Sequence, residues 1–153
     1  MIHLKAPQKL LKIFTAGSIE MGKAEPWQDR LAESLSRFNI VLFNPRRDDW
    51  DSSWTQDPTP GTQFHEQVSW ELEHIDDADI VVFYFDPNTQ SPITLLELGY
   101  CIGINKNMVV CCPDGYFRKG NVVISCAKRG VDVLNSYDEF ETAVGLKVQA
   151  ELT

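Results

Sequence analysis

The sequence lacks an apolar segment long enough to cross a membrane, and its N-terminal stretch, MIHLKAPQKLLKIF, lacks the apolar core of a signal peptide. Positive charge is also scarce, because 14 lysines and arginines stand against 22 aspartates and glutamates, which gives a net charge of −8. Such a balance argues against a nucleic-acid backbone or an anionic membrane as the main partner. The expected partner is a small molecule.

Cysteine is sparse as well, and its spacing shows no pairs of the kind that bind zinc. The four cysteines are Cys101, Cys111, Cys112 and Cys126. Buried free thiols in a reducing cytoplasm are the simplest explanation. The chain also lacks internal repeats, low-complexity tracts and linkers. Its 153 residues, 43% of them hydrophobic, therefore predict one globular domain spanning residues 1–153.

Apolar runs and amphipathic stretches alternate along the chain. The runs predict strands at residues 10–15, 40–43, 80–85, 108–112 and 131–134. Between them, apolar side chains recur at helical spacing, as in the sets Trp27, Leu31, Leu35, Phe38 and Val68, Leu72, Ile75. The alternation predicts an α/β fold, a doubly wound, flavodoxin-like parallel sheet of five strands in the order 2-1-3-4-5, with helices on both faces.

The stretch from Asp79 to Gly103 carries the most unusual residue. A buried strand is followed by turn residues, then by Ser91 and Pro92, which are typical of a helix N-cap and first helical position. Glu97 lies on that helix among leucines, just past the carboxyl end of a central strand, where open α/β sheets bind ligands. Alternatively, Glu97 is solvated on an exposed stripe or paired with a buried arginine.

Two motifs resemble a known family. Leu96-Glu97-Leu98-Gly99-Tyr100 resembles the nucleophile motif of the nucleoside 2-deoxyribosyltransferase family, which includes the 2'-deoxynucleoside 5'-monophosphate N-glycosidases. Phe14-Thr15-Ala16-Gly17-Ser18-Ile19 resembles the GSI segment of the nucleotide-hydrolysing branch. The similarity spans roughly residues 10–110 and implies that Glu97 is the nucleophile.

The resemblance also implies roles for three further regions. Gly17, Ser18 and Ile19 would help to hold the sugar and its 5' end, although a tight turn that needs glycine explains the same residues. Glu71, followed by Leu72, matches an acid that contacts the sugar or assists proton movement. Ser91 matches a phosphate-contacting serine of the hydrolase branch and is equally suited to be the helix N-cap.

Glu20 departs from the family pattern, because the nucleotide-hydrolysing branch tends to carry arginine at this position. A carboxylate repels a phosphate, so an unphosphorylated nucleoside is the better expected substrate.

The segment from Asn44 to Trp54 is unusually rich in charged and aromatic residues for a connection. One interpretation has Trp50 or Trp54 stacking on a nucleobase, with Asn44 or Asp49 bonding its edge. The other is a solvated loop whose charges pair among themselves. Trp70 is a further candidate for the stacking role.

The function implied by the resemblance is cleavage or transfer at the N-glycosidic bond of a (deoxy)nucleoside or nucleotide, through a glycosyl-enzyme ester on Glu97. No metal or redox cofactor is needed. Members of this family are usually homo-oligomers, so at least a dimer is expected. The competing hypothesis is a non-catalytic nucleotide-binding or sensing module on the same fold, in which Glu97 bonds a ribose hydroxyl.

Overall fold

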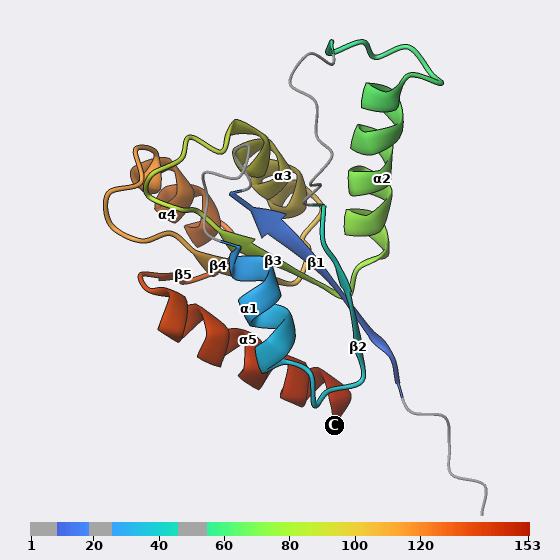
Figure 1. Cartoon of the computed structure of the whole chain (residues 1–153). Helices are drawn as coiled ribbons and strands as arrows, with labels where there is room; N and C mark the ends of the chain where they lie inside the picture. The colour runs from blue at the N-terminus through green and yellow to red at the C-terminus, as the bar shows by residue number, and fades with distance from the viewer. Residues whose placement is uncertain (1–8, 19–25, 46–54) are drawn as a thin grey trace, which may run out of the picture.

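The computed structural model describes residues 9–18, 26–45 and 55–153, in which strands and helices alternate (Figure 1). The strands are β1 (Leu11–Gly17), β2 (Ile40–Phe43), β3 (Ile80–Tyr84), β4 (Met108–Cys111) and β5 (Val133–Leu134). The helices are α1 (Trp27–Ser34), α2 (Gln63–Asp77), α3 (Pro92–Gly103), α4 (Lys119–Ala127) and α5 (Tyr137–Leu152).

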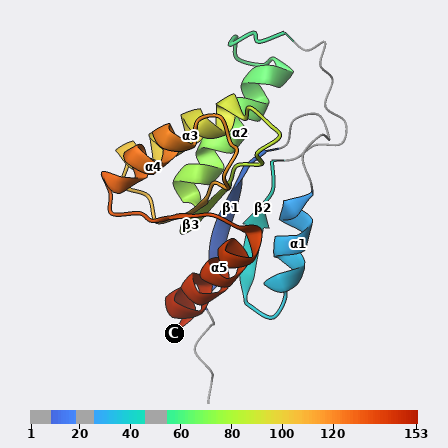
Figure 2. The same cartoon turned by 90° about the vertical axis from the view of Figure 1, so that its left-hand side faces the viewer.

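The sheet has the strand order β2-β1-β3-β4-β5, and every pairing is parallel. This confirms the predicted flavodoxin-like topology. β1 lies between β2 and β3, with Ile13 opposite Leu42 on one side and Ile80 on the other. Helices α2, α3 and α4 cover one face of the sheet, whereas α1 and α5 cover the opposite face (Figures 1 and 2).

The continuous apolar run of β3 is explained by its place between two helical layers. All five residues of the strand are buried. Val81 and Phe83 belong to the core under α2, α3 and α4, while Ile80, Val82 and Tyr84 belong to the core under α1 and α5. Because helices cover both faces of the sheet, the side chains of β3 are apolar on both of its faces. The carboxyl end of this strand leads directly to α3.

The apolar stripe predicted for α2 is not buried as a whole. Ile75 is fully buried, but Val68 and Leu72 are 36% and 38% exposed. The N-terminal half of α2 rises past the carboxyl ends of the strands, so the sheet covers only its C-terminal end (Figure 1). Periodicity identified the helix correctly, but it could not reveal that part of its apolar side has no cover within the chain.

Smaller differences from the prediction concern the ends of elements. β1 continues to Gly17, and α1 ends at Ser34, with Leu35 as its C-cap. β5 is only two residues long. A Cβ atom at Gly17 would collide with the Trp27 ring and the Tyr84 carbonyl oxygen, so this position needs glycine for close packing.

All four cysteines are buried and free, as predicted. The fully buried Trp27 packs at 5.5 Å from Tyr84 between ring centroids, which agrees with its place on a core-facing helix stripe. In the described part of the chain, no helix is both long and apolar enough to pass through a membrane.

Candidate functional site

Glu97 lies on the buried side of α3. The helix begins with Pro92 at its first position, and it packs through Thr94, Leu98 and Cys101. Glu97 shares this side and is only 7% exposed, and its Oε2 atom has no hydrogen-bond partner among the described residues. Burial, together with the negative charge of Glu71, raises the pKa of Glu97 to about 8. A buried carboxyl group at the carboxyl end of a central strand is a candidate reactive group.

Glu71 on α2 is a second acid, close enough for its charge to act on Glu97. It is half-buried, and the Gln67 side-chain Nε2 donates to its Oε1 at 3.0 Å. Burial raises the pKa of Glu71, while the bond from Gln67 opposes that rise. Because the negative charge of Glu71 disfavours the ionised form of Glu97, the ionisation of one carboxyl group depends on that of the other. Such a pair can hold a proton and release it during a reaction.

Three buried hydroxyl groups meet beside the start of α3. Ser18 Oγ lies 2.8 Å from Thr89 Oγ1 and 2.7 Å from Ser91 Oγ, and the last two atoms are 2.7 Å apart. The Asp86 N–H donates to Ser18 Oγ at 2.8 Å, and Thr89 Oγ1 donates to the Asp86 carbonyl oxygen at 2.9 Å. This hydroxyl cluster therefore joins the end of β1 to the β3–α3 loop.

Ser91 does not act as the side-chain N-cap that its position predicted. It precedes Pro92, but its hydroxyl makes no capping bond to the helix, and its backbone is left-handed with φ 47° and ψ 53°. The Ser18 N–H donates to the Tyr84 carbonyl oxygen at 3.1 Å, so this amide is engaged within the protein. The described end of the first loop is thus held by internal bonds.

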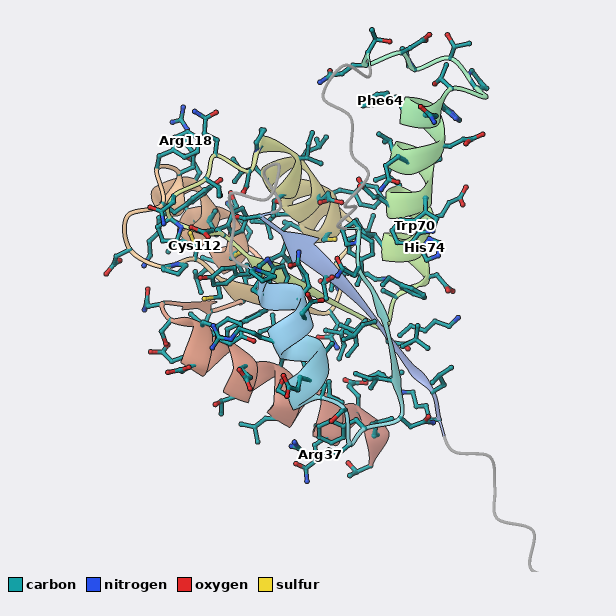
Figure 3. All side chains as sticks on the ribbon, viewed as in Figure 1. Arg37, Phe64, Trp70, His74, Cys112 and Arg118 are labelled. Atoms are coloured by element: carbon teal, nitrogen blue, oxygen red, sulfur yellow. The ribbon has the colours of Figure 1, made fainter. Side chains whose placement is uncertain are left out.

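A pocket of about 420 Å³ opens between the end of β2 and the projecting half of α2. Its lining residues are Asn44, Pro45, Gln63, Glu66, Gln67 and Trp70. Trp70 stacks on His74, one turn along α2, with ring centroids 4.1 Å apart (Figure 3). Gln67 both lines this pocket and bonds Glu71, so it connects the pocket to the acid pair. An apolar ring beside several amide groups suits a planar heterocycle with polar edges.

The structure brings together several of the residues that the sequence singled out. Glu71 interacts electrostatically with Glu97, Ser18 and Ser91 share the hydroxyl cluster, and Asn44 lines the pocket. Ile19, Asp49 and Trp50, like Glu20 and Trp54, lie outside the described residues.

Sequence reasoning missed Thr89 and Gln67 and left Trp70 as a secondary candidate. Gln67 lies one helical turn before Glu71, a spacing at which amide and acid side chains meet. Thr89 carried no comparable signal, because turn-rich segments commonly contain threonine and serine.

These features define an α/β protein with an acid pair at the carboxyl edge of its sheet. The family model described as nucleoside 2-deoxyribosyltransferase like matches residues 10–116. The chain therefore belongs to the nucleoside 2-deoxyribosyltransferase-like family. No curated protein sequence matches this chain.

Two solved structures resemble the fold. A conserved protein from Enterococcus faecalis V583 is 15% identical with a TM-score of 0.61, and the match covers 94% of this chain and 100% of that chain. A 2-deoxyribosyltransferase from Bacillus psychrosaccharolyticus is 18% identical with a TM-score of 0.59, and the match covers 90% of this chain and 95% of that chain. At these identities the likeness establishes the shared fold.

Proposed function

We propose that this protein cleaves or transfers at the N-glycosidic bond of a (deoxy)nucleoside or nucleotide, with Glu97 as the nucleophile. The observation that carries the proposal is a carboxylate that is 7% exposed, lies at the carboxyl edge of the sheet and interacts with a second acid. Membership of the family supports the class of substrate.

The chemistry proceeds as a displacement at the anomeric carbon. A Glu97 carboxylate oxygen bonds to C1' as the N-glycosidic bond breaks, and the base leaves with the electron pair and takes up a proton. Water or a second base then displaces Glu97 from C1', so the configuration is retained overall. Glu71, the other acid of the pair, is proposed to hold or pass the proton. These steps require no metal or redox cofactor.

The ionisation of Glu97 limits this reaction in the free protein. With a pKa of about 8, roughly a tenth of the Glu97 carboxyl groups are ionised at pH 7. Attack requires the ionised form, so the bound substrate must stabilise the carboxylate or accept its proton. Sugar hydroxyl groups that donate to Glu97 would do the former.

Substrate binding is proposed to involve both loops at this edge. Asn44, Asp49 and Trp50 would hold the base, and the pocket beside Trp70 supports a base site near Asn44. Gly17, Ser18, Ile19 and Ser91 would hold the sugar and its 5' end. Because the Ser18 and Ser91 hydroxyls already bond each other at 2.7 Å, and Glu20 carries negative charge, we favour nucleosides over monophosphates.

A second candidate function is a nucleotide-binding or sensing module. The raised pKa of Glu97 favours it, because a protonated carboxyl group can donate a hydrogen bond to a ribose hydroxyl without reacting. The two functions differ in whether free nucleobase is released from the substrate. Incubation with a panel of nucleosides and their 5'-monophosphates, followed by chromatography, should show base release for a glycosidase or transferase. Binding without release from any member would support the module.

A second copy of the chain is the proposed partner of the apolar surface over α2, α3 and α4. Among the residues that the structure describes, most of the exposed large apolar side chains lie on these helices or beside them: Val68, Leu72, Ile93, Leu96, Tyr100, Ile104, Phe117, Val123 and Ile124. Exposed apolar side chains gathered over neighbouring elements are typical of an interaction surface. We therefore propose a homo-oligomer. The four buried free cysteines support the cytoplasm as its proposed location.

A further inference from the structure

The start of α3 is built in an energetically unfavourable way. Ser91 has a left-handed backbone, which L-residues other than glycine rarely adopt, and Pro92 follows directly. Its hydroxyl does not offset this by capping the helix. A residue in such a conformation persists only where the surrounding structure holds it there. The hydroxyl cluster supplies side-chain bonds at this residue, from Ser18 and from Thr89.

The cluster is anchored to the sheet at both of its ends. Ser18 immediately follows β1 and is fully buried, and its Oγ accepts from the Asp86 N–H at the end of the β3 region. Thr89 is 4% exposed and donates to the Asp86 carbonyl oxygen. Ser91 is joined to both hydroxyls at 2.7 Å. The turn before α3 is thus tied to two adjacent central strands.

The same turn is bonded to the first turn of α3, the helix that carries Glu97. The first backbone bond of α3 runs from the Leu95 N–H to the Ser91 carbonyl oxygen at 3.2 Å. Successive residues of a helix are related by a fixed rotation, so a change in the first turn of α3 would be passed on to Glu97. Only 7% of Glu97 is exposed, so a small rotation of α3 would change its burial and its approach to Glu71.

We propose that Thr89, through the hydroxyl cluster with Ser18 and Ser91, is a positioning residue that holds Ser91 left-handed and thereby fixes the direction in which α3 presents Glu97. This goes beyond the proposed function, and it rests on that function only in treating Glu97 as the reacting group. Thr89 itself is not required to touch the substrate.

The test uses the full-length protein with a Thr89→Val substitution, which keeps the shape of the side chain and removes its hydroxyl. The titration of Glu97 is followed by NMR on protein with ¹³C-labelled glutamate carboxyl groups, and the signal is assigned by its loss in Glu97→Gln. We expect the midpoint to move by about half a pH unit or more in Thr89→Val. Thr89→Ser, which restores the hydroxyl, should return it to the parent value.

A matched control is available on the other face of the sheet. Thr15 is fully buried, and its Oγ1 donates to the Phe43 carbonyl oxygen of β2 at 3.0 Å, so this hydroxyl bonds outside the hydroxyl cluster. Thr15→Val makes the same chemical change and should leave the Glu97 titration in place. For base release, Thr89→Val should lower kcat by roughly 10- to 100-fold with little change in KM, because the reacting group is misplaced rather than lost.

Two results would overturn the proposal. One is a Thr89→Val protein whose Glu97 titration and kcat match the parent, whatever happens to its thermal midpoint. The other is a change that Thr89→Ser does not restore, which would assign the effect to packing. If no nucleoside releases base, the proposed function fails, but the titration still decides the role of Thr89.

Ser91→Ala and Ser91→Gly give a second pair, should Thr89→Val not fold. Both lose the hydroxyl, but glycine adopts positive φ freely and alanine does not. The proposal expects a larger shift of the Glu97 titration in Ser91→Ala than in Ser91→Gly. Two proteins with the parent's titration would overturn it.

Discussion

Glu71 on α2 raises the pKa of Glu97 on α3, adding to the larger effect of burial. The two acids come from separate helices, and only the return of the chain through β3 places them together. The Gln67 side chain holds Glu71 at 3.0 Å, so the position of the second acid is set within α2. The roles of the two acids can therefore be tested by three separate measurements: base release, its pH dependence and the stability of the fold.

Substitution of Glu97 by glutamine is expected to abolish base release while leaving the fold intact. The loss should be roughly 10³-fold or more if chemistry limits turnover, because the nucleophile is removed and the shape is kept. Chromatography of released base and circular dichroism give the two measurements. Glu73→Gln, at an exposed position of α2, is the matched control and should retain activity. Mutant turnover within about tenfold of the parent would exclude Glu97 as the nucleophile.

The pH dependence of kcat/KM should follow the ionisation of Glu97 in the free protein. Activity is expected to rise with pH up to about 8, because the attacking form is the carboxylate. In Glu71→Gln the repulsion is gone, so the rising limb should move to lower pH, although burial keeps it above the ordinary value of 4.5. A limb at the same pH in parent and Glu71→Gln would show that the two acids are not coupled.

Stability should respond to Glu97 in the opposite direction from an ordinary carboxylate. The folded protein binds this proton more tightly than the unfolded chain, so its contribution is fully present below about pH 4.5 and is lost as pH rises to about 8. The difference between these values corresponds to roughly 5 kcal/mol at high pH. Glu97→Gln removes the buried charge and should therefore be more stable than the parent at pH 9, but not at pH 5.

Urea unfolding at these two pH values measures the difference, with Glu73→Gln again as the control. Glutamine remains a buried polar group, which costs free energy of folding. The gain in the free energy of unfolding at pH 9 should therefore be about 2–4 kcal/mol, less than the full linkage value. A gain that is equal at pH 5 and pH 9 would mean that Glu97 ionises at its ordinary pKa in the folded protein.

The fold was predictable because its strands carry an unambiguous pattern. β3 is an uninterrupted apolar run, and in α5 the side chains of Phe140, Val144 and Val148 recur at helical spacing and are all buried. The burial of α2 was not predictable in the same way. Val68 and Leu72 fit a core-facing stripe, but whether the sheet reaches them depends on how far the helix projects, which is a tertiary property.

The site was predictable only in part. Glu97 stood out because a lone acid among leucines is anomalous, whereas Thr89 did not, because threonine in a turn is ordinary. Ser91 matched the local pattern of an N-cap, yet its hydroxyl bonds Ser18, which is 73 positions away in the sequence. Local rules consider only neighbouring residues, so a distant partner that competes for the same hydroxyl escapes them.

Leu96 offers a test of the proposed oligomer. It is 69% exposed on α3, one turn from the 55% exposed Ile93. Leu96→Glu places a charge in the apolar surface and should shift the protein toward the monomer, as measured by sedimentation velocity. Leu146→Glu is the control, because Leu146 is similarly exposed at 64% but belongs to α5, a helix on the opposite side of the sheet from α3 (Figure 2). A parent protein that sediments as a monomer at high concentration would contradict the proposal.

The nucleobase should be held by an aromatic ring, and two tryptophans are candidates. Trp50 was predicted from the composition of its loop, and Trp70 lines the pocket next to Asn44. We expect Trp50→Ala to weaken nucleoside binding by about 1–3 kcal/mol, the value of one stacked base, with little change in thermal midpoint. Trp70→Phe keeps a ring against His74 and should preserve most of the affinity and the stability. Isothermal titration and thermal unfolding of the parent and both variants separate the roles of the two tryptophans.

If Trp50→Ala binds like the parent and Trp70→Phe binds more weakly, the base lies against α2, because a smaller ring there gives less stacking area. A lower midpoint with unchanged affinity would instead make the substituted tryptophan a packing residue.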